Sequence, residues 1–319
     1  MGQPSFVSRR EFLVTGTLVA GAACVNPRLL FAQTPALGAG IVQNMRAAAA
    51  GASITVQSLQ GNVRVMMGSG GNIAVLPGRD GKLLVDAGIP ASRPRMVEAL
   101  ARISSDPITR LINTHWHFDH TDGNEWLHTS GATILAHANT RKHMATTTRV
   151  DDWDFTFPPW PAGALPTELI SSEKTLQING VAIHLRPYEP AHTDGDISVH
   201  FTDVDVFHVG DTWWNGVYPF IDYSTGGSIN GTIRATEVNL GIATAKTVII
   251  PGHGPVGNKS QLTEFHDMLV AVRAKVAALK KQGNSLAATL AAKPTAAYDA
   301  KWGSVVPPDL FAKVVYDGV

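Results

Sequence analysis

The stretch Thr114–His120 constrains the fold of this chain more than any other. It reads Thr-His-Trp-His-Phe-Asp-His, and four of its seven residues have side chains that bind metal cations. Alternating residues at the end of an extended strand point the same way, so His115 and His117 share one face. Asp119 and His120 follow directly and must point elsewhere. The stretch therefore offers two ligand sets and indicates two adjacent metals, with a histidine-rich surface loop as the alternative.

Further candidate ligands follow later predicted strands, which argues against the surface loop. They lie mostly beside glycine or proline turns. The seven candidates form two sets and one possible bridge: His115, His117 and His192; Asp119, His120 and His253; and Asp211. Imidazole and carboxylate ligands together suit Zn²⁺, with Fe and Mn as further possibilities. Paired metals in hydrolytic sites lie about 3.5–4 Å apart, so the sequence predicts a site for two Zn²⁺ ions.

The N-terminal segment is typical of an export signal. Ser8–Leu13 carries the pair Arg9 and Arg10 ahead of a weakly apolar run, Leu13–Val25. A paired arginine before a mild apolar segment is typical of twin-arginine export. The run is too short and too rich in glycine and alanine for a permanent membrane helix. We expect recognition by the twin-arginine translocase, cleavage after Ala32, a periplasmic or secreted location and no stable membrane association.

The charge balance of the chain narrows the class of partner. The 319 residues include 26 basic and 26 acidic side chains, for a formal net charge of zero. Hydrophobic residues make up 44 % and charged residues 16 %, as in a globular protein. Without a basic excess, a nucleic-acid partner is disfavoured and a small molecule is the expected substrate. Cys24 is the single cysteine, so rigidity must come from packing and metal rather than from an internal disulfide.

The order of predicted elements indicates an α/β fold. Four short strands within Ile54–Val85, separated by turns, predict an antiparallel meander. A helix at Arg93–Ile103 and a buried strand at Ile108–Ile112 follow. The metal-binding stretch then begins at the carboxyl end of that strand, where ligands commonly lie in layered α/β folds. The later predicted strands are Leu176–Leu185, Ile197–Phe201, Val204–Val209 and Thr247–Ile250. The later predicted helices are Thr232–Ala243 and Leu262–Lys281. This order suits two sheets with helices outside.

Three ranges describe the predicted domain organisation. We assign 1–32 to the signal, 33–52 to a linker with a short helix, and 53–319 to a catalytic domain with C-terminal helices.

Two loops of the predicted catalytic domain have possible functions. The glycine-rich tip Gly68–Gly71 is a candidate mobile flap. Thr146–Pro166 is too aromatic for a solvated linker and too rich in proline for regular structure. It is either a lid over a pocket or a loop packed on the core.

The candidate ligands, taken in order, resemble those of the metallo-β-lactamase superfamily. The shared motifs over Ile54–Lys281 are Asp86, His115-x-His117-x-Asp119-His120, His192, Asp211 and His253. The resemblance implies an αββα sandwich of two mixed β-sheets flanked by helices, with a dizinc site at one edge between the sheets. It also implies the two ligand sets above, bridged by Asp211. Asp86 is then a carboxylate that orients a metal-bound histidine.

This ligand set predicts a metal-dependent hydrolase. Two metals lower the pKa of a shared water from about 15.7 towards about 7, and the resulting hydroxide attacks a carbonyl carbon. Asp119 is the expected catalytic residue, since it can bind its metal, hold the nucleophile and relay a proton. No protein nucleophile is needed.

The substrate is less constrained than the reaction. β-Lactamases of this superfamily commonly lack the aspartate found here at Asp211, which is more similar to the glyoxalase II and lactonase branches. We expect opening of a small cyclic amide or ester, either a β-lactam or a lactone. The alternatives are a thioesterase of the glyoxalase II type and a non-hydrolytic periplasmic protein that handles a metal or redox cofactor.

Aromatic residues after Asp211 suggest a substrate pocket. Trp213, Trp214, Tyr218, Phe220 and Tyr223 follow it closely, and they would either line a mostly apolar pocket or form a cluster in the core. Asn230 is a candidate donor to the developing oxyanion.

Overall fold

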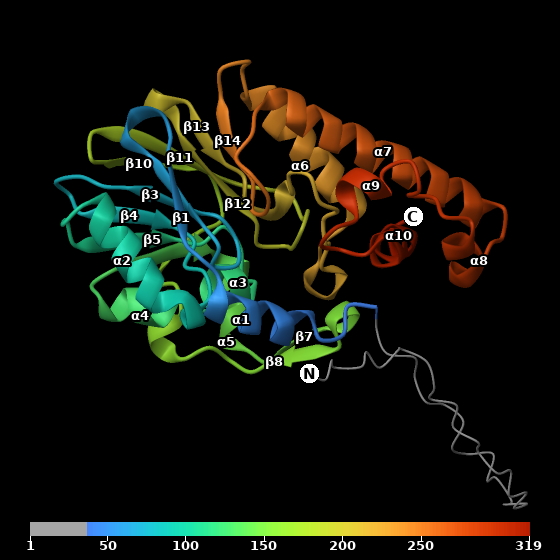
Figure 1. Ribbon diagram of the computed structural model, residues 1–319, viewed down its shortest axis with the longest axis horizontal. Coiled ribbons are helices and arrows are strands. Elements are labelled where there is room, and N and C mark those ends of the chain that lie inside the picture. Colours follow the sequence, from blue (N-terminus) through green and yellow to red (C-terminus); the bar gives the residue numbers. More distant parts are fainter. Residues whose placement is uncertain (1–36) are drawn as a thin grey trace, which may run out of the picture. The chain divides into compact units, whose positions relative to one another are not determined.

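The protein has the two-sheet, helix-flanked architecture that the sequence predicts. Its structure is a computed structural model, which describes residues 37–319. Two β-sheets lie face to face with helices on their outer sides, giving the αββα sandwich (Figure 1). The described residues belong to one compact unit, and the predicted signal at 1–32 lies outside them. Among residues 37–319, no helix is both long and apolar enough to cross a membrane.

The first sheet has seven strands in the order β1-β2-β3-β4-β5-β6-β9. Strands β1 to β4 pair antiparallel, as the predicted meander requires. From β4 onward the pairs β4–β5, β5–β6 and β6–β9 are parallel. The carboxyl ends of β4 and β5 therefore meet at one edge of the sheet. The strands are β1 Thr55–Ser58, β2 Arg64–Met67, β3 Ile73–Leu76, β4 Lys82–Val85, β5 Ile108–Ile112, β6 Thr133–His137 and β9 Glu168–Ile170.

The second sheet has five strands in sequence order, β10 to β14. They are antiparallel except for the final pair, β13 and β14, which is parallel. Candidate ligands thus follow strands of both sheets. The strands are β10 Lys174–Ile178, β11 Val181–Pro187, β12 Ile197–Phe201, β13 Val206–His208 and β14 Val248–Ile250. A separate two-stranded sheet pairs β7 Thr148–Val150 with β8 Phe155–Phe157.

The apolar strands are buried on both faces, which explains why the sequence shows continuous apolar runs. On β3, Ala74 and Leu76 pack in the core between the sheets, whereas Ile73 and Val75 pack with Met96 of the helix outside. Successive side chains of a strand point to opposite faces, so a strand covered twice needs apolar residues throughout. Burial of one such large side chain stabilises the fold by about 1.5–3 kcal/mol.

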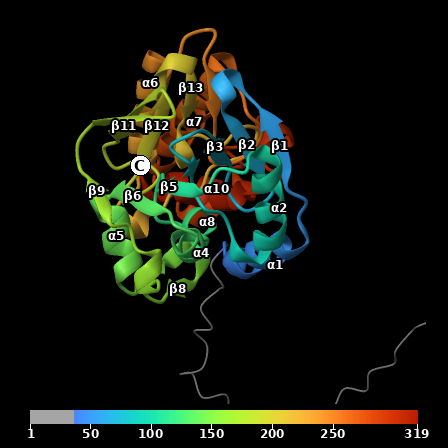
Figure 2. The same cartoon turned by 90° about the vertical axis from the view of Figure 1, so that its left-hand side faces the viewer.

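Helices cover both outer faces of the sandwich. Residues of α2 and α4 pack on the first sheet, and residues of α6, α7 and α10 share a core with the outer side chains of the second sheet. The turned view shows α6 and α4 on opposite sides of the strands (Figure 2). The helices are α1 Ile41–Gly51, α2 Arg93–Ile103, α3 Phe118–Thr121, α4 Asn124–Thr129, α5 Ala138–Ala145, α6 Ile229–Ile242, α7 Lys259–Lys281, α8 Leu286–Ala291, α9 Asp299–Trp302 and α10 Pro308–Asp317.

Three predicted elements differ from the structure. The single strand expected at Leu176–Leu185 is a hairpin of β10 and β11, because Asn179 and Gly180 adopt positive φ and turn the chain. The helix expected at Thr232–Ala243 begins earlier, at Ile229, because the Ser228 side chain accepts a hydrogen bond from Gly231 N and caps the helix. Thr146–Pro166 is not free of regular structure, since it contains β7 and β8. Its aromatic residues explain this, because rings such as Phe157 are buried and hold the short strands on the core.

The glycine-rich tip is also packed rather than exposed. Ser69 is 1 % exposed, and Gly71 N donates a hydrogen bond to Asp119 O at 3.3 Å. A Cβ atom on Gly70 would lie 2.6 Å from the same carbonyl oxygen. Glycine is therefore needed because this turn lies against the metal-binding stretch, and its movement as a flap stays a prediction.

Candidate active site

Asp86 connects the ends of two neighbouring parallel strands. It follows β4 with a φ of 69° and accepts hydrogen bonds from the backbone N and the hydroxyl of Thr114, both at 2.8 Å. Its Oδ2 also accepts a hydrogen bond from Nδ1 of His120 at 2.8 Å. His120 therefore directs its other ring nitrogen towards the remaining candidate ligands. This is the geometry by which a carboxylate orients a metal-binding histidine.

The structure brings all seven candidate ligands together. They form two groups, within each of which the ligand atoms lie within 4.8 Å of one another: His115, His117, His192 and Asp211; and Asp119, His120 and His253. Nδ1 of His117 faces Nε2 of His192 at 2.9 Å. In the second group, Nε2 of His120 lies 3.4 Å from Nε2 of His253. The grouping matches the two predicted sets, and the role of these residues as ligands stays a prediction.

Asp211 lies between the two groups, as a bridging carboxylate must. Its Oδ1 is 3.2 Å from Nε2 of His120. Its Oδ2 is 3.3 Å from Nε2 of His253 and 3.5 Å from Nε2 of His192. One carboxylate therefore touches histidines of both groups. The short turn after β13 places it there, and Gly252 approaches so closely that a Cβ would lie 1.8 Å from Asp211 Oδ1.

The buried polar atoms of the cluster fit divalent cations. Nε2 of His115, Oδ2 of Asp119 and Oδ1 of Asp211 are buried without a hydrogen-bond partner. An unsatisfied buried polar atom costs about 1–3 kcal/mol, and a cation would supply the missing partner. Imidazole and carboxylate donors together match the ligand preference of Zn²⁺ better than that of Mg²⁺, which prefers oxygen ligands.

The local electrostatics keep His115 and Asp211 in the protonation states that bind cations. For His120, burial lowers the pKa, but Asp211 and Asp119 outweigh burial and raise that pKa well above its usual value. Burial and the neighbouring His120 hold the pKa of His115 well below its usual value, so its ring is neutral at pH 7. Burial raises the pKa of Asp211, but the adjacent histidines, first His253 and then His120, outweigh burial and hold that pKa well below its usual value. The cluster therefore presents a neutral imidazole and an ionised carboxylate.

Asp222 belongs to the site but was not predicted. Its Oδ2 accepts hydrogen bonds from Nε2 of His117 at 3.1 Å and from the hydroxyl of Thr225 at 2.5 Å. Close by, the carbonyl oxygen of Phe220 accepts a hydrogen bond from Nδ1 of His192 at 2.8 Å. One loop therefore determines which nitrogen each of these two histidines turns towards the cluster. No spacing rule links Asp222 to His117, so only the folded contact reveals its role.

A cavity of about 250 Å³ opens onto the cluster. It is lined by Ile41, Asn44, Met45, His117, Asp119, Trp153, Asp211, Trp214, Phe220, His253, Val305 and Val306. Trp214 and Phe220 thus line a pocket, which was one of the two interpretations of the aromatic residues in the sequence. Trp153 both packs on the ring of Phe220, with centroids 4.6 Å apart, and lines the cavity. The walls from α1 and from Val305 and Val306 were not predicted.

Four residues predicted for the pocket lie elsewhere. Trp213 is fully buried in the core under α7. The hydroxyl of Tyr218 donates a hydrogen bond to Oδ1 of Asp299 at 2.9 Å. The hydroxyl of Tyr223 accepts one from Ile229 N at 3.1 Å, and Oδ1 of Asn230 accepts one from Nε of Arg273 at 2.6 Å. The structure therefore confirms the alternative, a cluster in the core, for Trp213, Tyr218 and Tyr223. The chain turns after Asp211 and directs these side chains and Asn230 towards the C-terminal helices.

Known proteins share the fold. A family model described as the metallo-beta-lactamase superfamily matches residues 67–253. The chain belongs to the metallo-β-lactamase superfamily. Superfamily members are metal-dependent hydrolases, so the coarse predicted activity is confirmed. The matched range contains Asp86 and every candidate ligand, whereas α1 and the Val305–Val306 wall lie outside it.

Individual relatives of the superfamily are distant. A hydroxyacylglutathione hydrolase of Polaromonas sp. is 26 % identical over 167 residues, which cover 52 % of this chain and 56 % of that relative. The chain thus spans little more than half the length of that relative. The solved stereoselective inverting sec-alkylsulfatase from Pseudomonas sp. is 14 % identical, with a TM-score of 0.59 over 83 % of this chain and 50 % of its own. A metallo-β-lactamase from Pontibacter korlensis is 17 % identical, with a TM-score of 0.54 over 68 % and 99 %.

Proposed function

We propose that this superfamily member is an exported dizinc hydrolase that opens the ester bond of a small neutral lactone. The observation that carries the proposal is the cavity, whose floor is formed by His117, Asp119, Asp211 and His253 and whose other lining is mostly apolar. Its volume of about 250 Å³ lies just below the usual range for ligand-binding pockets, about 300–1,000 Å³. A small molecule therefore fits better than a polymer.

Residues of the chain divide the chemical roles. When bound, the metals supply a water of lowered pKa and polarise the substrate carbonyl. Asp119 lines the cavity with an unpartnered Oδ2, so it is placed to hold the attacking water and accept its proton. Burial raises the pKa of Asp119, but His120 and His253 outweigh burial and lower that pKa. Among the described residues that line the cavity, no serine, cysteine or lysine offers a nucleophile.

The lining favours a lactone over a β-lactam. Bicyclic β-lactam substrates carry a carboxylate, which is normally matched by a cationic or polar group. No lysine or arginine stands among the described lining residues, and Asn44 is the one amide side chain there. A neutral substrate therefore loses less hydration on entering this cavity than an anionic one.

A thioesterase is the second candidate, because the Polaromonas relative is named a hydroxyacylglutathione hydrolase. Glutathione is anionic at neutral pH, so the same absence of lining cations disfavours it. A non-hydrolytic role in handling a periplasmic metal or redox cofactor is the third candidate. The open cavity beside Asp119 favours hydrolysis, since a carrier needs no substrate pocket over its metal.

Substrate profiling of the zinc-loaded protein tests this proposal. The panel is an N-acyl-homoserine lactone, a chromogenic cephalosporin and S-lactoylglutathione, each with and without a chelator. We expect fastest turnover of the lactone, loss of activity with the chelator and two zinc ions per chain by metal analysis. A faster cephalosporin or thioester reaction would refute the lactone assignment. No turnover of any substrate by protein with two zinc ions would refute the hydrolase.

Export is proposed separately from catalysis. Residues 1–32 fused to a reporter should direct it to the periplasm in a host with a twin-arginine translocase. Replacement of Arg9 and Arg10 by lysine should abolish that transport, because the route reads the arginine pair. Transport in a host without the translocase would contradict this assignment.

A further inference from the structure

The cavity has one apolar part, and four of its six lining residues lie outside the range that the superfamily model matches. It is formed by Ile41, Met45, Trp153, Phe220, Val305 and Val306. We propose that this part, the apolar subsite, binds an alkyl or aryl group attached to the substrate. The inference rests on the proposed hydrolase and specifies its substrate class. The same cavity includes Asp119 and His253, so a group held there would lie next to the bond being cleaved.

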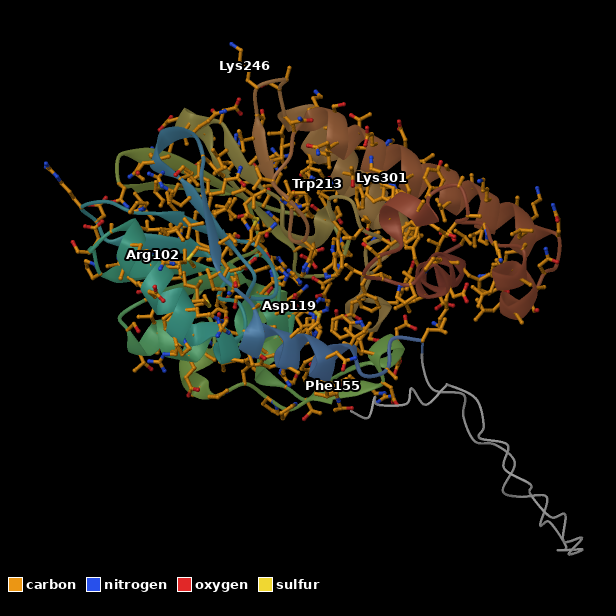
Figure 3. All side chains as sticks on the ribbon, in the orientation of Figure 1. Arg102, Asp119, Phe155, Trp213, Lys246 and Lys301 are labelled. Carbon is orange, nitrogen blue, oxygen red and sulfur yellow. The ribbon has the colours of Figure 1, made fainter. Side chains whose placement is uncertain are left out.

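Helix α1 forms a fixed wall of the apolar subsite. Ile41 and Met45 are four residues apart, so they share one face of the helix. Arg46 next to them pairs with Asp122, with Nη2 2.8 Å from Oδ2, and lies over the ring of Phe118 at 5.1 Å. Asp122 and Phe118 belong to the segment that carries the candidate ligands. Helix α1 is therefore tied directly to the metal-binding stretch, near Asp119 (Figure 3).

The opposite wall comes from the segment before α10. Tyr218 N donates a hydrogen bond to the carbonyl oxygen of Trp302 at 2.8 Å, which holds this segment against the loop after Asp211. Val306 is 4 % exposed and Val305 is 64 % exposed, yet both line the cavity. An occupant would remove the exposed valine surface from water. This gain is largest for a hydrophobic group.

The lining favours an uncharged occupant. No lysine or arginine stands among the described residues that line the cavity, so an anionic group held there would lose hydration without gaining a cationic side chain as partner. A chain-bearing, uncharged acyl compound therefore matches this lining better than an anion.

Alkyl hydroxamic acids, from acetyl to decanoyl, test the apolar subsite without requiring turnover. The hydroxamate head binds zinc, and the length of the tail is the only variable. Calorimetry on the zinc-loaded protein should show affinity rising about fourfold for each methylene that is buried, until the subsite is full. Equal affinities along the series, or no binding, would overturn the inference. The same chain-length dependence is expected for kcat/KM on acyl-homoserine lactones.

Two variants test whether the proposed wall residues cause the rise in affinity with tail length. Met45→Gln and Val305→Gln should each reduce the gain per methylene to less than twofold, because a polar amide replaces an apolar contact. Val305 is largely exposed, so its variant does not endanger folding. Ala48→Gln is the matched control, since Ala48 is exposed on α1 and does not line the cavity. If both wall variants gain as much affinity for each methylene as the wild-type protein, the proposal of the apolar subsite is overturned.

The result separates this inference from the proposed function. Affinity that rises with tail length in a protein that cleaves no ester supports the apolar subsite and refutes the hydrolase. Lactone hydrolysis without any dependence on tail length supports the hydrolase and refutes the subsite.

Discussion

Replacement of Asp222 by asparagine tests whether the loop before α6 controls metal binding. Asparagine has nearly the same shape, so it fills the fully buried position of Asp222. The change removes the negative charge of the carboxylate whose Oδ2 accepts the hydrogen bond from Nε2 of His117 at 3.1 Å. Loss of such a supporting carboxylate typically lowers metal affinity 10–100-fold, which corresponds to about 1.4–2.7 kcal/mol. We expect a zinc-affinity loss of this size in Asp222→Asn.

Zinc competition with a chelating dye measures that loss directly. Thermal unfolding with and without zinc adds a second readout, because the free energy by which a ligand stabilises the folded state rises with the logarithm of its affinity. The zinc-induced rise in unfolding temperature should shrink by several degrees, whereas the metal-free protein should change much less. If Asp222 served packing alone, the substitution would lower the unfolding temperature of the metal-free protein as much as that of the zinc-bound protein.

Asp205→Asn is the matched control for this experiment. Asp205 accepts hydrogen bonds from the Thr247 hydroxyl at 2.8 Å and the Thr244 hydroxyl at 3.3 Å, and it is not among the residues of either candidate metal group. Its variant should keep wild-type zinc affinity. If Asp222→Asn also keeps wild-type affinity, or loses no more than Asp205→Asn, the reasoning about the loop is refuted.

Three further predictions concern the cluster and its surroundings. Asp119→Ala should retain its fold by circular dichroism but lose most of its turnover and one equivalent of zinc; full activity would contradict its catalytic role. Gly227→Ala should destabilise the protein by more than about 1 kcal/mol in denaturant unfolding, since a Cβ there would lie 2.3 Å from the carbonyl oxygen of His192. Burial lowers the pKa of His253, but Asp211 and Asp119 raise it to about 9, so metal-free His253 is protonated at pH 7. Zinc binding should release that proton, measured by calorimetry in buffers of different ionisation enthalpy, and zinc affinity should fall as pH falls below 9.

The predicted fold succeeded where local pattern and strand geometry agree. Short apolar runs such as Ile73–Leu76 predicted strands, and the turn residues between them predicted the meander. Helix boundaries were less certain, because the start of α6 depends on the Ser228 cap rather than on apolar periodicity. The candidate ligands could be predicted from the sequence because several of them follow predicted strands, and the fold brings the ends of these strands to one edge.

The pocket was predicted poorly for a physical reason. Trp213 and Trp214 are neighbours in sequence, yet only Trp214 lines the cavity. Proximity to Asp211 along the chain does not determine which way a side chain points after a turn. Asp222 carried no spacing signal, because its partner His117 lies over 100 residues earlier and meets it only in the folded chain.

By itself, the sequence determined the superfamily, the two-sheet architecture and the identity of the candidate ligands, since these follow from local periodicity and a short motif. Only the tertiary structure decided which side chains support the ligands and which enclose the substrate. Those contacts join α1, the loop before α6 and the segment before α10. They depend on the packing of segments far apart in the chain, and no local pattern encodes that packing.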